Sequence, residues 1–176
     1  MPSASLDWLA LEDHIHSRMF DEVRTYRQRQ PEQNVYSAAF HAFYGETGGV
    51  IYWPALSLGT EAGLVEASAG SSFSPDDLRW SPADRPVKVD PSADDEAWAA
   101  RVQQAAVGDG DEEWEAVYDR FLRTFALAAK DVRRMLISRD IVDEAFLALA
   151  MDEEGQLIPL SLTAEQLRTH FPELAP

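Results

Sequence analysis

The side chains that could perform acid–base or metal chemistry are spread widely along this 176-residue sequence. Of the four histidines, His14 and His16 lie two residues apart, and His41 and His170 are remote from them. On a helix, a spacing of two directs side chains to different faces, so this pair cannot chelate one metal ion. Neighbouring carboxylates fall at expected turns and helix starts, where they accept backbone hydrogen bonds. We therefore expect no metal site and no cofactor.

Motifs for nucleophilic catalysis and nucleotide binding are absent from the sequence. It contains neither G-x-S-x-G nor S-x-x-K, the motifs that carry an activated serine. It also contains neither G-x-x-x-x-G-K-[ST] nor G-x-G-x-x-G, whose glycines let the backbone approach phosphates. The lack of cysteine excludes a thiolate nucleophile, thiolate metal ligands and disulfide bonds. These observations favour a non-catalytic protein, and we predict no catalytic residue.

Negative charge is the main surface property that the composition predicts. The formal net charge of −16 disfavours binding to nucleic acids and anionic membranes, because both are polyanions. Between Asp90 and Asp119 there are ten acidic residues and one basic residue, Arg101. This stretch predicts an acidic face on two central helices that suits a basic protein partner; the alternative is a solvated face that only maintains solubility. The residues expected to contact the partner are Asp94, Asp95, Glu96, Asp111, Glu112 and Glu113, with Trp53 and Trp80 as aromatic anchors.

Aromatic residues around the first expected hairpin indicate a second kind of site. Tyr52 and Trp53 lie near a strand end, and Trp80 lies in the long connection 68–92. Such residues either anchor an interface or cap the core. A pocket where the hairpin meets segment 68–92 would suit a small molecule or an undetected hydrolase, and a further alternative is a structural subunit of a homodimer. The groups expected in that pocket are His41, Tyr44, Arg79 and Asp84, together with Trp53 and Trp80.

The helices that must position these residues are predicted from apolar periodicity and capping. Apolar residues recur three and four positions apart in three long segments, and the last of these has the strongest periodicity. Thr60 and the capping-box pair Thr163 and Gln166 mark the starts of two shorter helices. The expected helices span about 7–30, 60–67, 94–107, 111–138 and 163–171.

Strands are predicted where aromatic and β-branched residues run without a helix cap. The first two form a hairpin across a glycine-rich turn, and the last two form a hairpin across an acidic turn. Residues 79–80 and 87–89 could each add a short strand. The main strands are expected at 35–44, 50–58, 141–151 and 156–162. The predicted fold class is α+β, with a mostly antiparallel sheet of about four to six strands packed against several helices in one domain spanning residues 1–176.

The N-terminal segment lacks a basic region followed by an apolar run, which is unlike a signal peptide. No stretch approaches the roughly 20 apolar residues of a membrane span. The lack of cysteine fits a reducing compartment. We therefore expect a soluble, cytoplasmic protein.

One part of the sequence resembles a known protein family. The resemblance lies in the run Leu78-Arg79-Trp80-Ser81-Pro82-Ala83-Asp84, the strand YSAAFHAFYGE, the pair Thr60-Glu61 and the segment FLALAMDEEG. These are similar to domain-of-unknown-function family 4303, an uncharacterised bacterial group. An aromatic residue often follows the aspartate in that family, whereas this chain has Arg85. The resemblance brings no catalytic residue, and small acidic α+β families of this kind look like immunity proteins, which implies an inhibitor of a basic toxin domain.

Overall fold

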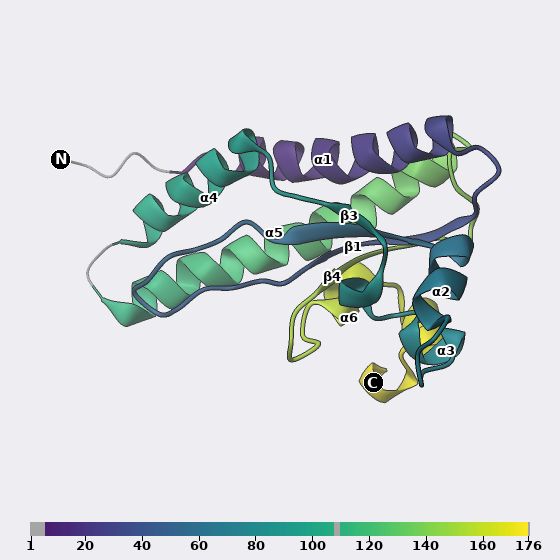
Figure 1. Ribbon diagram of the computed structural model, residues 1–176. Coiled ribbons are helices and arrows are strands. Elements are labelled where there is room, and N and C mark those ends of the chain that lie inside the picture. The colour runs from purple at the N-terminus through teal and green to yellow at the C-terminus, as the bar shows by residue number, and fades with distance from the viewer. Residues whose placement is uncertain (1–5, 108–109, 176) are drawn as a thin grey trace.

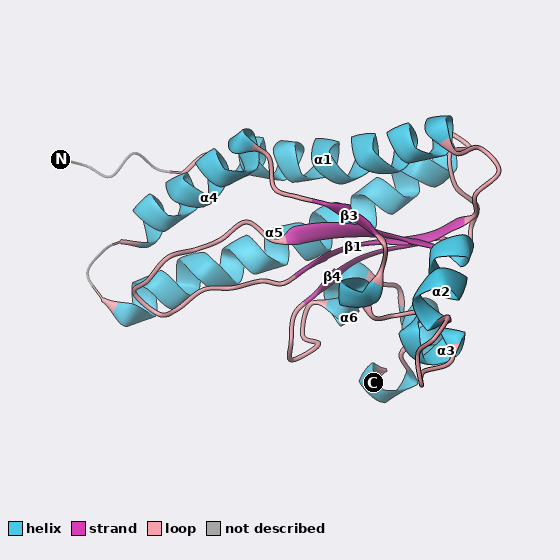
Figure 2. Ribbon diagram, viewed as in Figure 1, coloured by secondary structure: helices cyan, strands magenta, loops and turns pink. Residues whose placement is uncertain are grey.

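The computed structural model describes residues 6–107 and 110–175. A four-stranded sheet has long helices on one face and short helical segments on the other (Figure 1, Figure 2). The predicted α+β class is confirmed. The sheet has four strands and is mixed, so the expectation of a mostly antiparallel sheet of up to six strands was too specific.

The strand order in the sheet is β3-β2-β1-β4. β1 (Val35–His41) pairs antiparallel with β2 (Ala55–Thr60), which pairs antiparallel with β3 (Val87–Val89). β4 (Leu147–Met151) pairs parallel with β1. Every residue of β1 is buried, because β1 is an inner strand and both faces of the sheet are covered.

Three long helices form the layer on the first face of the sheet: α1 (Trp8–Arg29), α4 (Ala93–Ala106) and α5 (Asp111–Ser138). α5 contacts α1, α4 and β4, and its apolar side chains lie at the centre of the main core. Phe121 and Phe125 are fully buried there, with ring centroids 5.0 Å apart in an edge-to-face arrangement. The periodicity of the sequence predicted this helix correctly, because the same residues that repeat at helical spacing are the ones that are buried.

Short helical segments cover the second face of the sheet. An apolar cluster there joins Leu149 of β4 to Ile158 and Phe171. Thr163 and Gln166 form the predicted capping box. The segments are α2 (Glu61–Ser68), α3 (Pro75–Leu78), the 3₁₀ helix η1 (Pro82–Asp84), α7 (Ala164–His170) and the 3₁₀ helix η2 (Pro172–Leu174). The short helix α6 (Ile158–Ser161) lies at the β4 edge of the sheet, where it also contacts α5.

The predicted hairpin of residues 141–151 and 156–162 is wrong. Within 141–151, only β4 (Leu147–Met151) is a strand, and the segment 156–162 contains the short helix α6 (Ile158–Ser161) in place of a strand. The Asp152 carboxylate accepts a hydrogen bond from the Leu157 N–H at 2.9 Å, and the Ser161 hydroxyl accepts one from the Ala150 N–H at 3.0 Å. These bonds hold the short helix beside edge strand β4. A short apolar run is compatible with either a strand or a buried helix, so periodicity alone could not distinguish them.

The first predicted hairpin exists, but its strands are shorter than expected. β1 ends at His41 because Ala42 adopts a left-handed conformation with φ of 59°. β2 begins only after Pro54, which has no N–H to donate to a strand partner. Of the two short strands suggested in the long connection, 87–89 is confirmed as β3, whereas Trp80 lies in a turn.

Candidate functional site

The connection between β1 and β2, residues 42–54, extends beyond the sheet and runs beside α5 to its first turns (Figure 1). Trp114 of α5 donates from Nε1 to the Gly49 carbonyl at 3.3 Å, and Thr47 donates to the Glu115 carboxylate at 3.4 Å. Gly45 lies so close to α5 that a Cβ there would be 2.7 Å from the Tyr118 ring. The absence of a side chain at Gly45 therefore allows the connection to lie against α5.

The outer side of this connection exposes large apolar and aromatic side chains. Tyr44 and Tyr52 are each 58% exposed, and Val50 is 47% exposed. Together with Glu46 they line a groove of about 360 Å³. We call Tyr44, Glu46, Val50 and Tyr52 the tip surface. Exposed tyrosines beside a groove of mixed polarity are typical of a protein-binding surface, since tyrosine contributes large contact area at low entropic cost.

Acidic side chains flank the tip surface. Glu46 is the one charged residue lining the groove within the described part of the chain. Asp111 and Glu112 are exposed at the start of α5, and the Asp111 carboxylate lies close to Gly48 of the connection. Glu115, also exposed, holds Thr47. The groove therefore lies in a region of negative charge.

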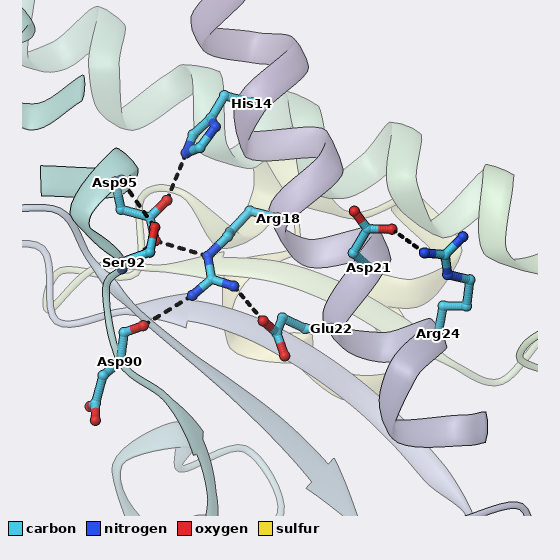
Figure 3. A network of polar contacts seen from close by, with 8 residues as sticks. All are labelled: His14, Arg18, Asp21, Glu22, Arg24, Asp90, Ser92 and Asp95. Carbon is cyan, nitrogen blue, oxygen red and sulfur yellow. Dashed lines mark hydrogen bonds and ion pairs between the residues drawn. The ribbon is translucent and has the colours of Figure 1, made fainter. Parts of the chain in front are cut away.

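The other predicted acidic group, at the start of α4, has a different environment. Asp95 is fully buried and accepts from His14 Nε2 at 2.7 Å and from Arg18 Nε at 2.8 Å (Figure 3). It also accepts from the Ser92 N–H at 2.8 Å, and Arg18 donates to the Asp90 carbonyl at 3.0 Å. Asp95 joins the start of α4 to α1 and is not part of an exposed acidic face.

Burial alone would raise the pKa of Asp95, but hydrogen bonds from the Ser92 backbone, Arg18 and His14 outweigh it and hold that pKa below its usual value. Asp94 and Glu96 beside it are exposed. They lie at the start of α4, which is about 21 Å long for its 14 residues, whereas Asp111 and Glu112 lie at the start of α5. The acidic face predicted on two helices is thus divided into two separate groups.

The two predicted tryptophan anchors lie inside the fold. Trp53 is only 6% exposed, and its ring lies 4.9 Å from Phe125 and 5.3 Å from His14. Trp80 is half-buried on the second face, with its ring 5.8 Å from Tyr36. Trp53 is therefore a core residue, and Trp80 closes the second face rather than forming part of the tip surface.

The four polar residues predicted to line a pocket do not meet at one place. Tyr44 is on the tip surface, whereas the other three lie on the second face around Arg85. Arg79 forms a two-point ion pair with Glu61 at 2.8 and 3.2 Å. Asp84 accepts a hydrogen bond from Ser81 in the loop at η1. Both of these side chains thus have partners within the second face.

His41 is a buried neutral histidine at the end of β1. Burial first, and then the charges of Arg85 and Lys88, together lower its pKa to about 4. Its Nε2 atom has no hydrogen-bond partner within the described ranges. A base with such a low pKa is almost fully deprotonated at neutral pH, but within residues 6–107 and 110–175 no nucleophile is hydrogen-bonded to it.

Sequence reasoning did not single out two residues of the tip surface, Glu46 and Val50, or the buried Arg85 of the second face. The glycine-rich turn at 45–49 was the available signal for the first two, since such turns project their neighbours outward. No local pattern indicates that Arg85 is buried, because its burial depends on α2 and β2.

Comparisons with protein-family models, with curated proteins and with solved structures found no match for this chain. Among the described residues, no group of three or more histidine, aspartate or glutamate side chains is arranged to hold a metal ion. In the same ranges, no helix combines the length and apolar character needed to cross a membrane. The tip surface is thus interpreted from its geometry and charge alone.

Proposed function

We propose that this chain is a non-catalytic protein-binding domain that holds a basic segment of a partner protein on the tip surface. The observation that carries the proposal is the pair of exposed tyrosines, Tyr44 and Tyr52, beside a groove with a carboxylate in its wall. An inhibitor of a basic toxin, acting in the cytoplasm, is the form of this function that we favour, by analogy with small acidic α+β families that look like immunity proteins.

Two physical effects support a basic partner. The net charge of −16 attracts a cationic protein at long range and speeds its encounter. At contact, Glu46 lines the groove and Asp111 lies close to Gly48 of the same connection, so a partner with lysine or arginine around an apolar side chain matches both its charge and its surface. Trp114 and Gly45 hold the groove against α5, which reduces the ordering cost of binding.

A random peptide library displayed on phage tests this proposal. Peptides selected on the wild-type protein should be enriched in lysine and arginine around an apolar or aromatic residue. The double variant Tyr44→Ser/Tyr52→Ser should bind them at least about tenfold more weakly, because interface tyrosines commonly each contribute more than 1 kcal/mol. Raising the salt concentration should weaken wild-type binding.

The matched control is Leu9→Ser/Val65→Ser, which removes two exposed apolar side chains from α1 and α2. It should bind the selected peptides as tightly as the wild type. Selection of acidic or uncharged peptides, or equal binding by the tyrosine variant, would contradict the proposal. Light scattering is run in parallel: a wild-type dimer that the tyrosine variant loses would show instead that a second copy occupies the tip surface.

A further inference from the structure

The connection between β1 and β2 sorts its side chains onto two faces. The Tyr52 N–H donates to the Tyr44 carbonyl at 3.2 Å, and Gly45 forms an antiparallel bridge with Ile51. Successive side chains of an extended segment point to opposite faces. Gly45 and Ile51 therefore share the face directed at α5 and the main core, whereas Tyr44 and Tyr52 project outward from directly opposite positions.

Glu46 continues the outward face of the same segment. It lies two positions after Tyr44, and its carbonyl accepts from the Gly49 N–H at 2.6 Å in the turn that closes the connection. Its side chain lines one groove with Tyr44, Val50 and Tyr52. The two tyrosines, a carboxylate and a small apolar side chain are thus brought to a single place by the pairing of the connection with itself.

The two tyrosine rings are open to a partner. Within residues 6–107 and 110–175, no aromatic ring and no arginine side chain forms a stacking or cation–π contact with either of them. Elsewhere in the fold arginines do lie over aromatic rings, and the Arg120 guanidinium carbon is 4.1 Å from the centroid of the Trp8 ring. The negative face of an aromatic ring attracts such a cation. Tyr44 and Tyr52 offer the same contact to an arginine from outside.

The Glu46 carboxylate is also open. Glu46 is exposed, and no basic side chain in the described part of the chain forms an ion pair with it. A carboxylate can accept two parallel hydrogen bonds from the planar fork of a guanidinium. A lysine ammonium is a compact, strongly hydrated charge that neither forms this fork nor lies flat on a ring. Glu46 beside tyrosine rings therefore suits arginine better than lysine.

The size of the groove agrees with the entry of one side chain. Its volume of about 360 Å³ lies near the lower end of the range of about 300–1,000 Å³ that is typical of small-ligand pockets. A single long side chain fits such a groove, whereas a folded element of a partner does not.

We infer that the basic residue which enters the groove of the tip surface is an arginine of the partner protein. Its guanidinium lies against the ring of Tyr44 or Tyr52 and donates two hydrogen bonds to the Glu46 carboxylate, while an adjoining apolar side chain packs on Val50. This inference rests on the proposed function and specifies the partner residue that the tip surface selects. Net charge attracts arginine and lysine equally, so the discrimination between them is made in the groove.

NMR titration of the isotope-labelled full chain at low salt tests this inference. The probes are three short synthetic peptides that differ at one position, where arginine, lysine or citrulline stands beside a leucine; citrulline keeps the shape of arginine without its charge. The arginine peptide should shift the amide resonances of residues 44–52. It should bind about fivefold more tightly than the lysine peptide, because a two-point hydrogen bond and ring stacking add to the shared charge. The citrulline peptide should bind most weakly.

Two variants locate the source of the preference. Glu46→Gln should bring the affinities for the arginine and lysine peptides to within about twofold of each other, because an amide offers one uncharged acceptor oxygen. The matched control is Glu153→Gln, which removes an exposed carboxylate from the turn after β4 and should keep the fivefold ratio. Since the readout is a ratio within each variant, a general loss of charge or stability does not imitate the result.

The outcomes separate this inference from the proposed function. No binding of any cationic peptide, or shifts confined to residues outside 44–52, would contradict both. Equal binding of the arginine and lysine peptides at 44–52 would leave the proposed function in place and overturn the arginine preference alone. A preference that survives Glu46→Gln would also overturn the inference, since it would show that the carboxylate is not the partner of the guanidinium.

Discussion

Buried polar residues on the second face of the sheet determine how this protein responds to protons. Ser37, His41 and Arg85 carry the buried side-chain atoms that have no hydrogen-bond partner in the part of the chain that the structure describes. Ser37 and His41 both lie on β1, and Ser57 lies on the neighbouring strand β2. A histidine in such a place is kept neutral because a charged ring would be poorly solvated and close to other cations.

The first prediction concerns His41 and acid stability. Its pKa is about 4 in the folded protein and near 6.5 when unfolded, so between these values the unfolded state binds a proton that the folded state does not. The stabilising contribution is therefore complete above pH 6.5 and is lost as the pH falls toward 4. The loss should amount to about 3 kcal/mol, since one pKa unit is about 1.4 kcal/mol.

Urea unfolding at several pH values checks this prediction. His41→Asn should flatten the decline between pH 6.5 and 4. The comparison variant is His170→Asn: burial and then Arg79 also lower the pKa of His170, but this histidine is less buried, so its removal should change the slope less. An unchanged slope in His41→Asn would contradict the assignment.

At the scale of elements, the network around Asp95 explains how α4 is attached. α4 follows edge strand β3 and packs mainly against α5, and its first turn is joined to α1 (Figure 1). Asp95 accomplishes this as both a capping-box residue of α4 and a partner of His14 and Arg18 on α1. Asp95 is far from His14 and Arg18 in the sequence, but the three side chains lie together in the folded chain (Figure 3).

Asp95→Asn should destabilise the protein by about 2–3 kcal/mol, because it weakens the cap and leaves the Arg18 charge without its buried partner. The matched control is Glu96→Gln, in the same helical turn but exposed, and its change should stay within about 0.5 kcal/mol. Chemical denaturation measures both, and hydrogen exchange should rise first at the start of α4. Equal stability of the two variants would be evidence against the structural role of Asp95.

At the scale of the whole molecule, the charge imbalance opposes folding. There are 31 acidic and 15 basic residues, so the folded chain concentrates negative charge that the unfolded chain spreads out. Exposed carboxylates such as Glu112, Glu153 and Glu173 lie on separate elements of the fold and repel one another across the surface.

Increasing the ionic strength with sodium gluconate should therefore raise the unfolding midpoint, because the Debye length falls from about 30 Å at 0.01 M to 8 Å at 0.15 M. A variant with three exposed carboxylates removed, Glu112→Gln/Glu153→Gln/Glu173→Gln, should show a smaller rise. A midpoint that falls or stays constant in the wild type would contradict this electrostatic account.

Local sequence patterns determined the helical layer and part of the sheet. α1, α4 and α5 follow from apolar spacing, α2 and α7 from capping residues, and the β1–β2 hairpin from aromatic runs around a glycine-rich turn. These features depend on neighbours within a few positions, which the sequence displays directly. The acidic character of the surface was also predicted, because the composition gives the net charge whatever the fold.

Only the tertiary structure decided the parallel pairing of β4 with β1, the helical form of 158–161 and the burial of Trp53, Asp95 and Arg85. His14 and Asp95 are 81 residues apart, and Ser57 and Arg85 are 28 apart. Whether a charged residue faces water or a partner depends on such distant contacts, whose energies no local pattern records. For that reason the sequence predicted an acidic protein correctly, but the structure determined which of its charges are free to bind.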